Sequence, residues 1–283
     1  MRKRKKQSKT IRLPLWLAAL LLIAAWALSH TPVADWWRQQ VQQPAATLAL
    51  PEGTQLELPA PLSDRPAQTI AHRGYTLSYN RDTKQANWVA WELNRDKLVE
   101  RESRTDKFLP DPNLPADEAV TTDDYVGSGY DRGHLCPAGD NRYHWRAMQE
   151  SFYMTNICPQ NHNLNAGDWK ELEELCRRWA EQEGTIYIVC GPVFQGKRHK
   201  TIGRQHRIPV PESFFKAVLC TSCQPPRAIG FLFANRAGNR PLEKYVTTVD
   251  QLEELTGIDF FASLPDDVEQ VVESAADLSQ WSR

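Results

Sequence analysis

The chain has 283 residues, of which 41% are apolar, and its formal net charge is −1. This length allows one well-buried core, and the balanced charge excludes a globally basic surface. Seven of the 34 basic residues lie in the first twelve positions, whereas residues 249–283 carry nine acids and one base. The nearly neutral body between them can still bind phosphate through a local basic groove.

The N-terminus has the pattern of a targeting or membrane segment. Residues 1–12 are a basic run, predicted to be a cytoplasmic end, and residues 13–28 carry no charge. This apolar stretch is slightly shorter than the roughly 20 residues of a spanning helix. We therefore predict that residues 13–29 are a transmembrane anchor or a cleaved signal peptide, and the long basic run favours the anchor. Either would place the following domain outside the cytoplasm, in the periplasm or the extracellular space.

Four regions follow in the predicted organisation. Residues 30–66, rich in Pro, Gln and Ala, are expected to be a linker, and residues 67–265 a folded domain. In that domain, alternating segments at 69–79 and 88–93 predict a hairpin, and apolar runs at 185–190, 214–220 and 228–234 predict further strands. The acidic tail, residues 266–283, is expected to be loosely attached.

Two helices have clear sequence signals, and a shorter one is expected within residues 142–154. Apolar residues recur at three- and four-residue steps across residues 168–182, and Gly184 ends the pattern. Thr248 and Gln251 form a capping box for a helix that ends near Gly257. Because strands outnumber helices in an irregular order, the predicted class is α+β with a largely antiparallel sheet.

Two polar stretches, residues 130–141 and 155–173, carry the candidate chemistry. The first contains Asp131-Arg132-Gly133-His134, and its glycines and proline exclude a long regular element. The second contains a series of polar and aromatic positions: Asn156, Pro159-Gln160, Asn165, Trp169 and Glu173. Together, this motif and series resemble those of the DNA/RNA non-specific endonucleases, a likeness that covers roughly residues 69–264.

The resemblance implies a ββα-metal nuclease fold, with a central, mostly antiparallel sheet flanked by helices. It implies Mg²⁺ or another divalent cation such as Mn²⁺ as cofactor, DNA and RNA as substrates, and products with 5′-phosphates. Family members often dimerise, so a homodimer is a further expectation, as is contact with a membrane through the N-terminal segment.

The candidate residues suit these roles chemically. His134 matches the general base, and its ordinary pKa of about 6.5 leaves it mostly neutral at pH 7. Asn165 matches the metal ligand, because its amide oxygen is a hard donor for an ion that keeps several waters. Glu173 lies about 12 Å further along a helix, so we expect it to act through metal-bound waters.

Two arginines are expected to hold phosphate, because guanidinium donors form a planar fork. Arg132 is the first, and Arg101 aligns best with the second, although Arg104 is close enough to compete. Asn156 and Gln160 are expected to brace the site. His144 and His162 receive no role. The basic segment 195–207 fits a nucleic-acid-binding rim or a solvated hairpin loop equally well.

Six cysteines in an exported chain suggest disulfides. We expect that Cys136 pairs with Cys158 and that Cys220 pairs with Cys223. Cys176 and Cys190 would be a third pair or free thiols.

Two rival functions remain open. In the first, the pairs His134/Cys136 and Cys158/His162 bind zinc in a structural module that cleaves nothing. In the second, a degenerate nuclease serves as an anchored receptor for nucleic acid. The zinc hypothesis gives no role to Arg132, Asn165 and Glu173. The receptor hypothesis is disfavoured because all the catalytic positions named above are present.

Overall fold

The computed structural model describes residues 51 and 53–281. The predicted basic end, the apolar segment 13–29 and the first part of the linker lie outside these residues. Within the described part, no helix combines the length and the apolar character needed to cross a membrane.

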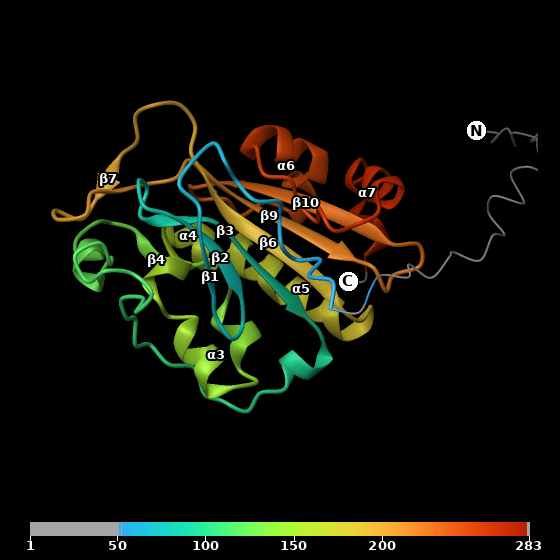
Figure 1. The fold of residues 1–283 in the computed structure, drawn as a ribbon, viewed down its shortest axis with the longest axis horizontal. Helices are drawn as coiled ribbons and strands as arrows, with labels where there is room; N and C mark the ends of the chain where they lie inside the picture. The colour runs from blue at the N-terminus through green and yellow to red at the C-terminus, as the bar shows by residue number, and fades with distance from the viewer. Residues whose placement is uncertain (1–50, 52, 282–283) are drawn as a thin grey trace, which may run out of the picture. The chain divides into compact units, whose positions relative to one another are not determined.

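A seven-stranded sheet forms the centre of the domain (Figure 1). Its strands, in spatial order, are β1 (Gln68–Ala71), β2 (Thr76–Asn80), β3 (Gln85–Leu93), β6 (Ile186–Val193), β9 (Ser213–Cys220), β10 (Arg227–Ala234) and β11 (Val246–Thr247). All neighbouring strands are antiparallel, so the α+β class is confirmed. The segment 69–79, expected as one strand, bends back on itself and supplies both β1 and β2.

Aromatic side chains pack helices on both faces of this sheet. On one face, Trp169 and Trp179 of α5 (Asp168–Gln182) contact Phe233 and Phe231 of β10. On the other, Phe215 of β9 packs against Phe260, which follows α6 (Val249–Thr256). Figure 1 shows α6 and α7 (Asp266–Glu273) together on this second side. The sheet is therefore covered on both faces, as its buried strands require.

The capping box predicted at Thr248 begins α6. The Thr248 side chain accepts from the backbone N–H of Gln251, and the Gln251 side chain accepts from the backbone N–H of Thr248. Gly257 ends the helix in the left-handed conformation (φ +66°), which glycine adopts without a steric penalty. The strongest predicted helix, residues 168–182, has the bounds of α5.

The remaining elements are short. They comprise the helices α3 (Trp145–Glu150) and α4 (His162–Ala166), the strand pairs β4 (Asp131–His134) with β5 (Ile157–Gln160) and β7 (Thr201–Ile202) with β8 (Ile208–Pro209), and 3₁₀ helices at Arg95–Leu98, Thr122–Tyr125, Ala138–Asn141, Met154–Asn156, Leu242–Lys244 and Leu278–Gln280.

The acidic tail is packed against the domain, so the expected loose attachment is wrong for residues 266–281. Val272 of α7 and Trp281 are each only 3% exposed. The Trp281 ring lies 4.5 Å from that of Trp179, measured between centroids. Two large apolar side chains thus hold a segment that carries five acids and no base.

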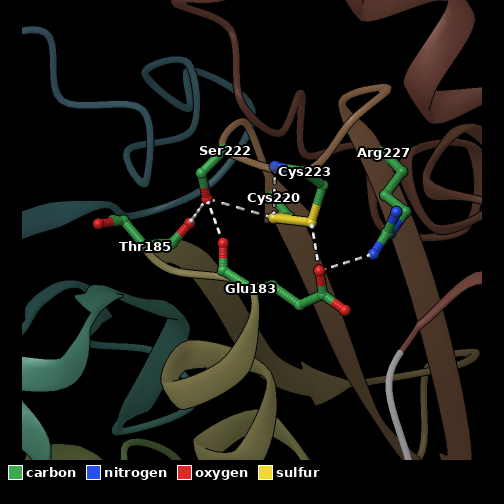
Figure 2. Close-up of a disulfide and its surroundings, with 6 residues drawn as sticks. All are labelled: Glu183, Thr185, Cys220, Ser222, Cys223 and Arg227. Atoms are coloured by element: carbon green, nitrogen blue, oxygen red, sulfur yellow. Dashed lines mark hydrogen bonds and ion pairs between the residues drawn. A yellow bond between two sulfur atoms is a disulfide. The ribbon is translucent and has the colours of Figure 1, made fainter.

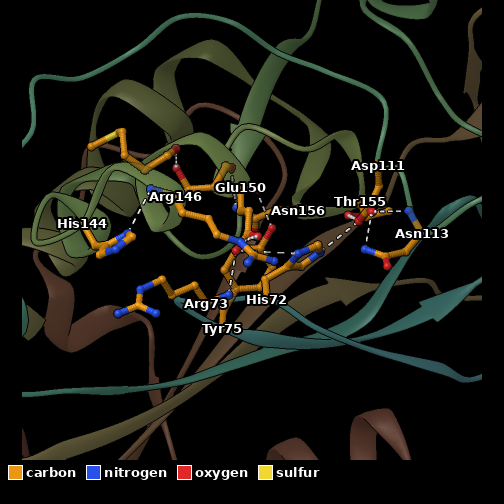
Figure 3. A network of polar contacts seen from close by, with 12 residues as sticks. His72, Arg73, Tyr75, Asp111, Asn113, His144, Arg146, Glu150, Thr155 and Asn156 are labelled. Atoms are coloured by element: carbon orange, nitrogen blue, oxygen red, sulfur yellow. Dashed lines mark hydrogen bonds and ion pairs between the residues drawn. The ribbon is translucent and has the colours of Figure 1, made fainter.

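A buried polar network anchors the long loop that connects β3 to β4. Asp111 of this loop contacts His72 (Nε2 to Oδ2, 2.9 Å) and accepts a hydrogen bond from Thr155 Oγ1 at 2.6 Å (Figure 3). Nearby, Glu150 accepts from the backbone N–H of Arg73 at 2.6 Å. These contacts fix the loop beside the segment that leads into β5.

One of the expected disulfides forms. Cys220 and Cys223 are bonded in the turn between β9 and β10, where Ser222 donates a hydrogen bond to the Glu183 carbonyl (Figure 2). The other four cysteines, all within the described part, are buried free thiols: Cys136, Cys158, Cys176 and Cys190. The expected Cys136–Cys158 bridge is therefore wrong, and Cys176 and Cys190 take the free alternative.

Candidate active site

A β-hairpin followed by helices places the two polar stretches together. Strands β4 and β5 pair antiparallel, with Asp131 opposite Gln160 and His134 opposite Ile157, and α4 and α5 follow directly. Gly133 makes this pairing possible, because a Cβ there would lie 2.2 Å from Gln160 Oε1. The arrangement is the ββα unit that the motif predicts.

His134 lies in an aromatic pocket at the end of β4. It is 8% exposed, and its ring centroid is 4.7 Å from Phe152 and 5.5 Å from Phe108. Its carbonyl accepts a hydrogen bond from Trp169 Nε1, which ties the strand to α5. Nε2 is buried, and no residue within the described part of the chain forms a hydrogen bond with it. Burial, with the positive charges of Arg104 and Arg132, lowers the pKa of His134 to about 3, so the ring is neutral at pH 7.

Two arginines flank this pocket. The Arg132 guanidinium carbon lies 4.3 Å from the Phe108 ring centroid, and that of Arg104 lies 5.2 Å from the Phe152 centroid. Arg101 is exposed, and its backbone N–H donates to the Arg142 carbonyl. The role predicted for Arg101 stays a prediction, but the geometry favours the competing residue, Arg104.

Asn165 of α4 is held in place by Asp131. Its Nδ2 donates to Asp131 Oδ2 at 2.8 Å, and the same oxygen contacts His162 Nδ1 at 2.9 Å. Among the described residues, none donates a hydrogen bond to Asn165 Oδ1. Asn165 and Arg132 both line a hollow of about 350 Å³, and an amide oxygen is a hard donor that suits a magnesium ion. His162, which received no role from the sequence, is thus part of the site.

Glu173, which is half-buried, belongs to a charge cluster with Lys216, Arg177 and Asp140. Burial raises its pKa to about 7, partly offset by Lys216 and Arg177. Lys216 is 1% exposed, and its Nζ lies 4.3 Å from the Trp169 ring centroid. Burial alone would lower the pKa of Lys216, but nearby thiols and the carboxyls of Glu173 and Asp140 raise it.

The sequence carries one signal for this cluster. Lys216 is the single charged residue of an otherwise apolar strand, and a lysine there needs an acidic partner. Arg177, one helical turn after Glu173, pairs with Asp140 at 3.0 Å. Asp140 also accepts from Trp91 Nε1, so the cluster connects α5 to β3 and β9.

Asn156 and Gln160, the two residues expected to brace the site, differ in their hydrogen bonds. Asn156 accepts from the Cys136 N–H and donates to the carbonyls of Cys136 and Ser151, which fixes the chain just after His134. The side-chain amide of Gln160 is buried without a hydrogen-bond partner and packs against Gly133. His144 caps α3 by accepting from the Arg146 N–H.

The geometry does not support the zinc module. In the described part of the chain, a single group of three or more histidine, cysteine or acidic side chains converges closely enough to hold an ion, and it lies in α6 and α7. His162 contacts Asp131, and Asn141 donates to the Cys136 thiol. The four proposed zinc ligands therefore do not form one site.

This fold and site define a class of protein, and comparison with known proteins identifies it. Residues 55–267 match the model of the DNA/RNA non-specific endonuclease family, and the chain belongs to this family. It is 36% identical over 208 residues to a protein named Nuclease EXOG, mitochondrial, of Xenopus laevis, a match that covers 68% of this chain and 58% of the relative. It is 37% identical over 215 residues to a nuclease of Nostoc sp., covering 72% and 76%.

A solved structure supports the same assignment. The chain resembles one in a crystal structure of an EndoG/EndoGI complex, with a TM-score of 0.65 and 25% identity, over 71% of this chain and 89% of the other. The match to the frog relative spans less than two thirds of that protein's length.

The comparisons correct the expected localisation. Relatives from frog, fission yeast and human are named as mitochondrial nucleases, which contradicts a membrane-anchored or secreted protein with its domain in the periplasm or outside the cell. A basic run before an apolar segment occurs in several kinds of targeting sequence, so this pattern alone does not define a destination.

Proposed function

We propose that this chain is a metal-dependent endonuclease that hydrolyses phosphodiester bonds in DNA and RNA with little sequence specificity. The observation that carries the proposal is His134: a neutral imidazole with an unpartnered Nε2, between two arginines, in a chain of this nuclease family. A neutral imidazole can take a proton, and arginines bind phosphate, so the pocket combines the two groups that the reaction requires.

In this mechanism, His134 removes a proton from the water that attacks phosphorus. Arg132 and Arg104 hold the phosphate and offset the charge that develops on it. Asn165 would hold Mg²⁺, which supplies positive charge at the phosphate and at the leaving 3′ oxygen. Glu173 would contribute to ion binding through water rather than directly. The products would carry 5′-phosphates, and the active form would be a homodimer, both on the strength of the family resemblance.

The hairpin of β7 and β8 is the proposed rim for nucleic acid. Lys200 lies over the Tyr130 ring, 4.7 Å from its centroid, directly before the motif. Arg204 is exposed at the tip of the same hairpin. Exposed cations next to the site would attract the phosphate backbone of a long substrate without reading its sequence.

The test compares wild type with His134→Ala and with His144→Ala. His144 is a matched control because it caps α3 outside the aromatic pocket. Supercoiled plasmid and a structured RNA are incubated with each protein in magnesium or in EDTA. We expect magnesium-dependent cleavage of both substrates, reduced about 10²–10⁴-fold in His134→Ala alone. Cleavage that persists in EDTA or in His134→Ala would refute the proposal.

A further inference from the structure

Three carboxylates of α6 and α7 converge. These two helices lie on the face of the sheet opposite α5 (Figure 1). The carboxylates are those of Asp250 and Glu253 of α6 and Glu273, the last residue of α7. Each offers one oxygen, and these oxygens all lie within 4.8 Å of one another. Three like charges at this separation repel one another unless a cation or protons neutralise them.

Glu273 gives the independent indication of a ligand. It is only 3% exposed, yet its Oε1 has no hydrogen-bond partner. A buried carboxylate oxygen without a partner is costly, because it has lost its hydration without replacement. Glu253 differs, since its Oε1 accepts from the backbone N–H of Phe260 at 2.7 Å. The carboxyl group that carries this unpaired oxygen converges with two further carboxylates.

The surrounding charge is also acidic. The carboxyls of Glu269 and Asp259 act on Glu273 together with those of Glu253 and Asp250. Burial and this repulsion raise the pKa of Glu273 to about 9, and burial is also the main cause that raises the pKa of Glu253 to about 7.

We propose that Asp250, Glu253 and Glu273 bind a calcium ion that joins α7 to α6. Calcium binds oxygens at 2.3–2.6 Å, so two ligands of one ion lie at most about 5 Å apart, as these oxygens do. Carboxylates from two separate helices suit the flexible coordination of calcium better than the rigid octahedron of magnesium. The ion is distinct from the catalytic one, because α6 and α7 cover the face of the sheet away from α5.

The experiment uses full-length protein that carries Asn165→Ala, so that the catalytic ion does not contribute. After treatment with EDTA and dialysis, thermal unfolding is followed with increasing calcium. Because calcium binds the folded chain, we expect Tm to rise by about 5–10 °C at a calcium concentration 100 times the dissociation constant. Calorimetric titration with calcium should give one site per chain.

Two variants and a control locate the site. In the same background, Glu273→Gln and Asp250→Asn should each lose most of the calcium-induced shift. Glu254→Gln should keep it, because Glu254 is exposed on α6 and outside the group. If Glu273→Gln does not fold, Asp250→Asn decides, since Asp250 is exposed. The proposal is overturned if calcium leaves the Tm of the Asn165→Ala protein unchanged. It is also overturned if calcium raises the Tm of the Glu273→Gln and Asp250→Asn variants as much as that of the Glu254→Gln control.

Discussion

At the scale of single residues, two arginines three positions apart have different environments. Both are exposed, but Arg104 contacts the aromatic pocket and acts on the charge of both His134 and Glu173, whereas the Arg101 backbone pairs with Arg142. We expect Arg104→Ala to lower kcat/KM about 100-fold and Arg101→Ala to change it less than about twofold. Both variants remove one positive charge, so steady-state cleavage rates at one salt concentration compare them directly. A larger loss in Arg101→Ala than in Arg104→Ala would instead support Arg101 as the second phosphate-binding arginine.

The sequence could not make this choice. Both arginines lie in a polar loop without periodicity, so nothing local indicates which one contacts the aromatic pocket. The choice depends on the path of the loop, which Asp111 fixes through His72 and Thr155. By contrast, the short motif that contains His134 lies on a paired strand, which fixes its position directly.

The depressed pKa of His134 predicts how stability depends on pH. Its folded pKa of about 3 lies below the ordinary 6.5, so between these values the unfolded chain holds a proton that the folded chain lacks. Stability therefore rises with pH across this window. In EDTA, wild type should lose up to about 1.4 kcal/mol more per pH unit than His134→Gln as pH falls from 6.5. Urea unfolding at several pH values measures the free energy of unfolding of the two proteins. Parallel curves of this free energy against pH would contradict the lowered pKa of His134.

At the scale of elements, local signals succeeded where they were strong. The apolar repeat gave the bounds of α5, and the capping box with Gly257 gave those of α6. The prediction for the tail was wrong because it rested on the acidic composition of the segment. Val272 and Trp281 stand among acids and serines, and only the complete fold shows that both are buried.

This packing of the tail is directly testable. Trp281→Ala removes a buried ring that contacts Trp179, and should lower the free energy of unfolding by about 3–5 kcal/mol. Trp145→Ala is the matched control, because Trp145 is 59% exposed, and it should cost under about 0.5 kcal/mol. Denaturant unfolding of the two variants gives both values. Equal small effects would mean that the tail is loosely attached after all.

At the scale of the whole molecule, the motif predicted the family of the protein, but not the charged residues that surround the candidate active site. Residues distant in sequence converge on Glu173, among them Lys216 of β9 and Asp140. Disulfide connectivity also depends on distances that spacing does not give. The adjacent pair Cys220 and Cys223 was therefore the one bridge that sequence predicted correctly.

The distribution of charge over the molecule gives the last prediction. A chain with a net charge of −1 attracts nucleic acid only where cations gather locally. If the β7–β8 hairpin is that place, alanine at both Lys200 and Arg204 should raise KM with little change in kcat. It should also reduce the slope of log binding constant against log salt by up to about 2. A control variant with alanine at Arg95 and Arg178, exposed on other elements, loses the same net charge. Since only local cations release counterions from the bound strand, equal effects in the two variants would place the binding surface elsewhere.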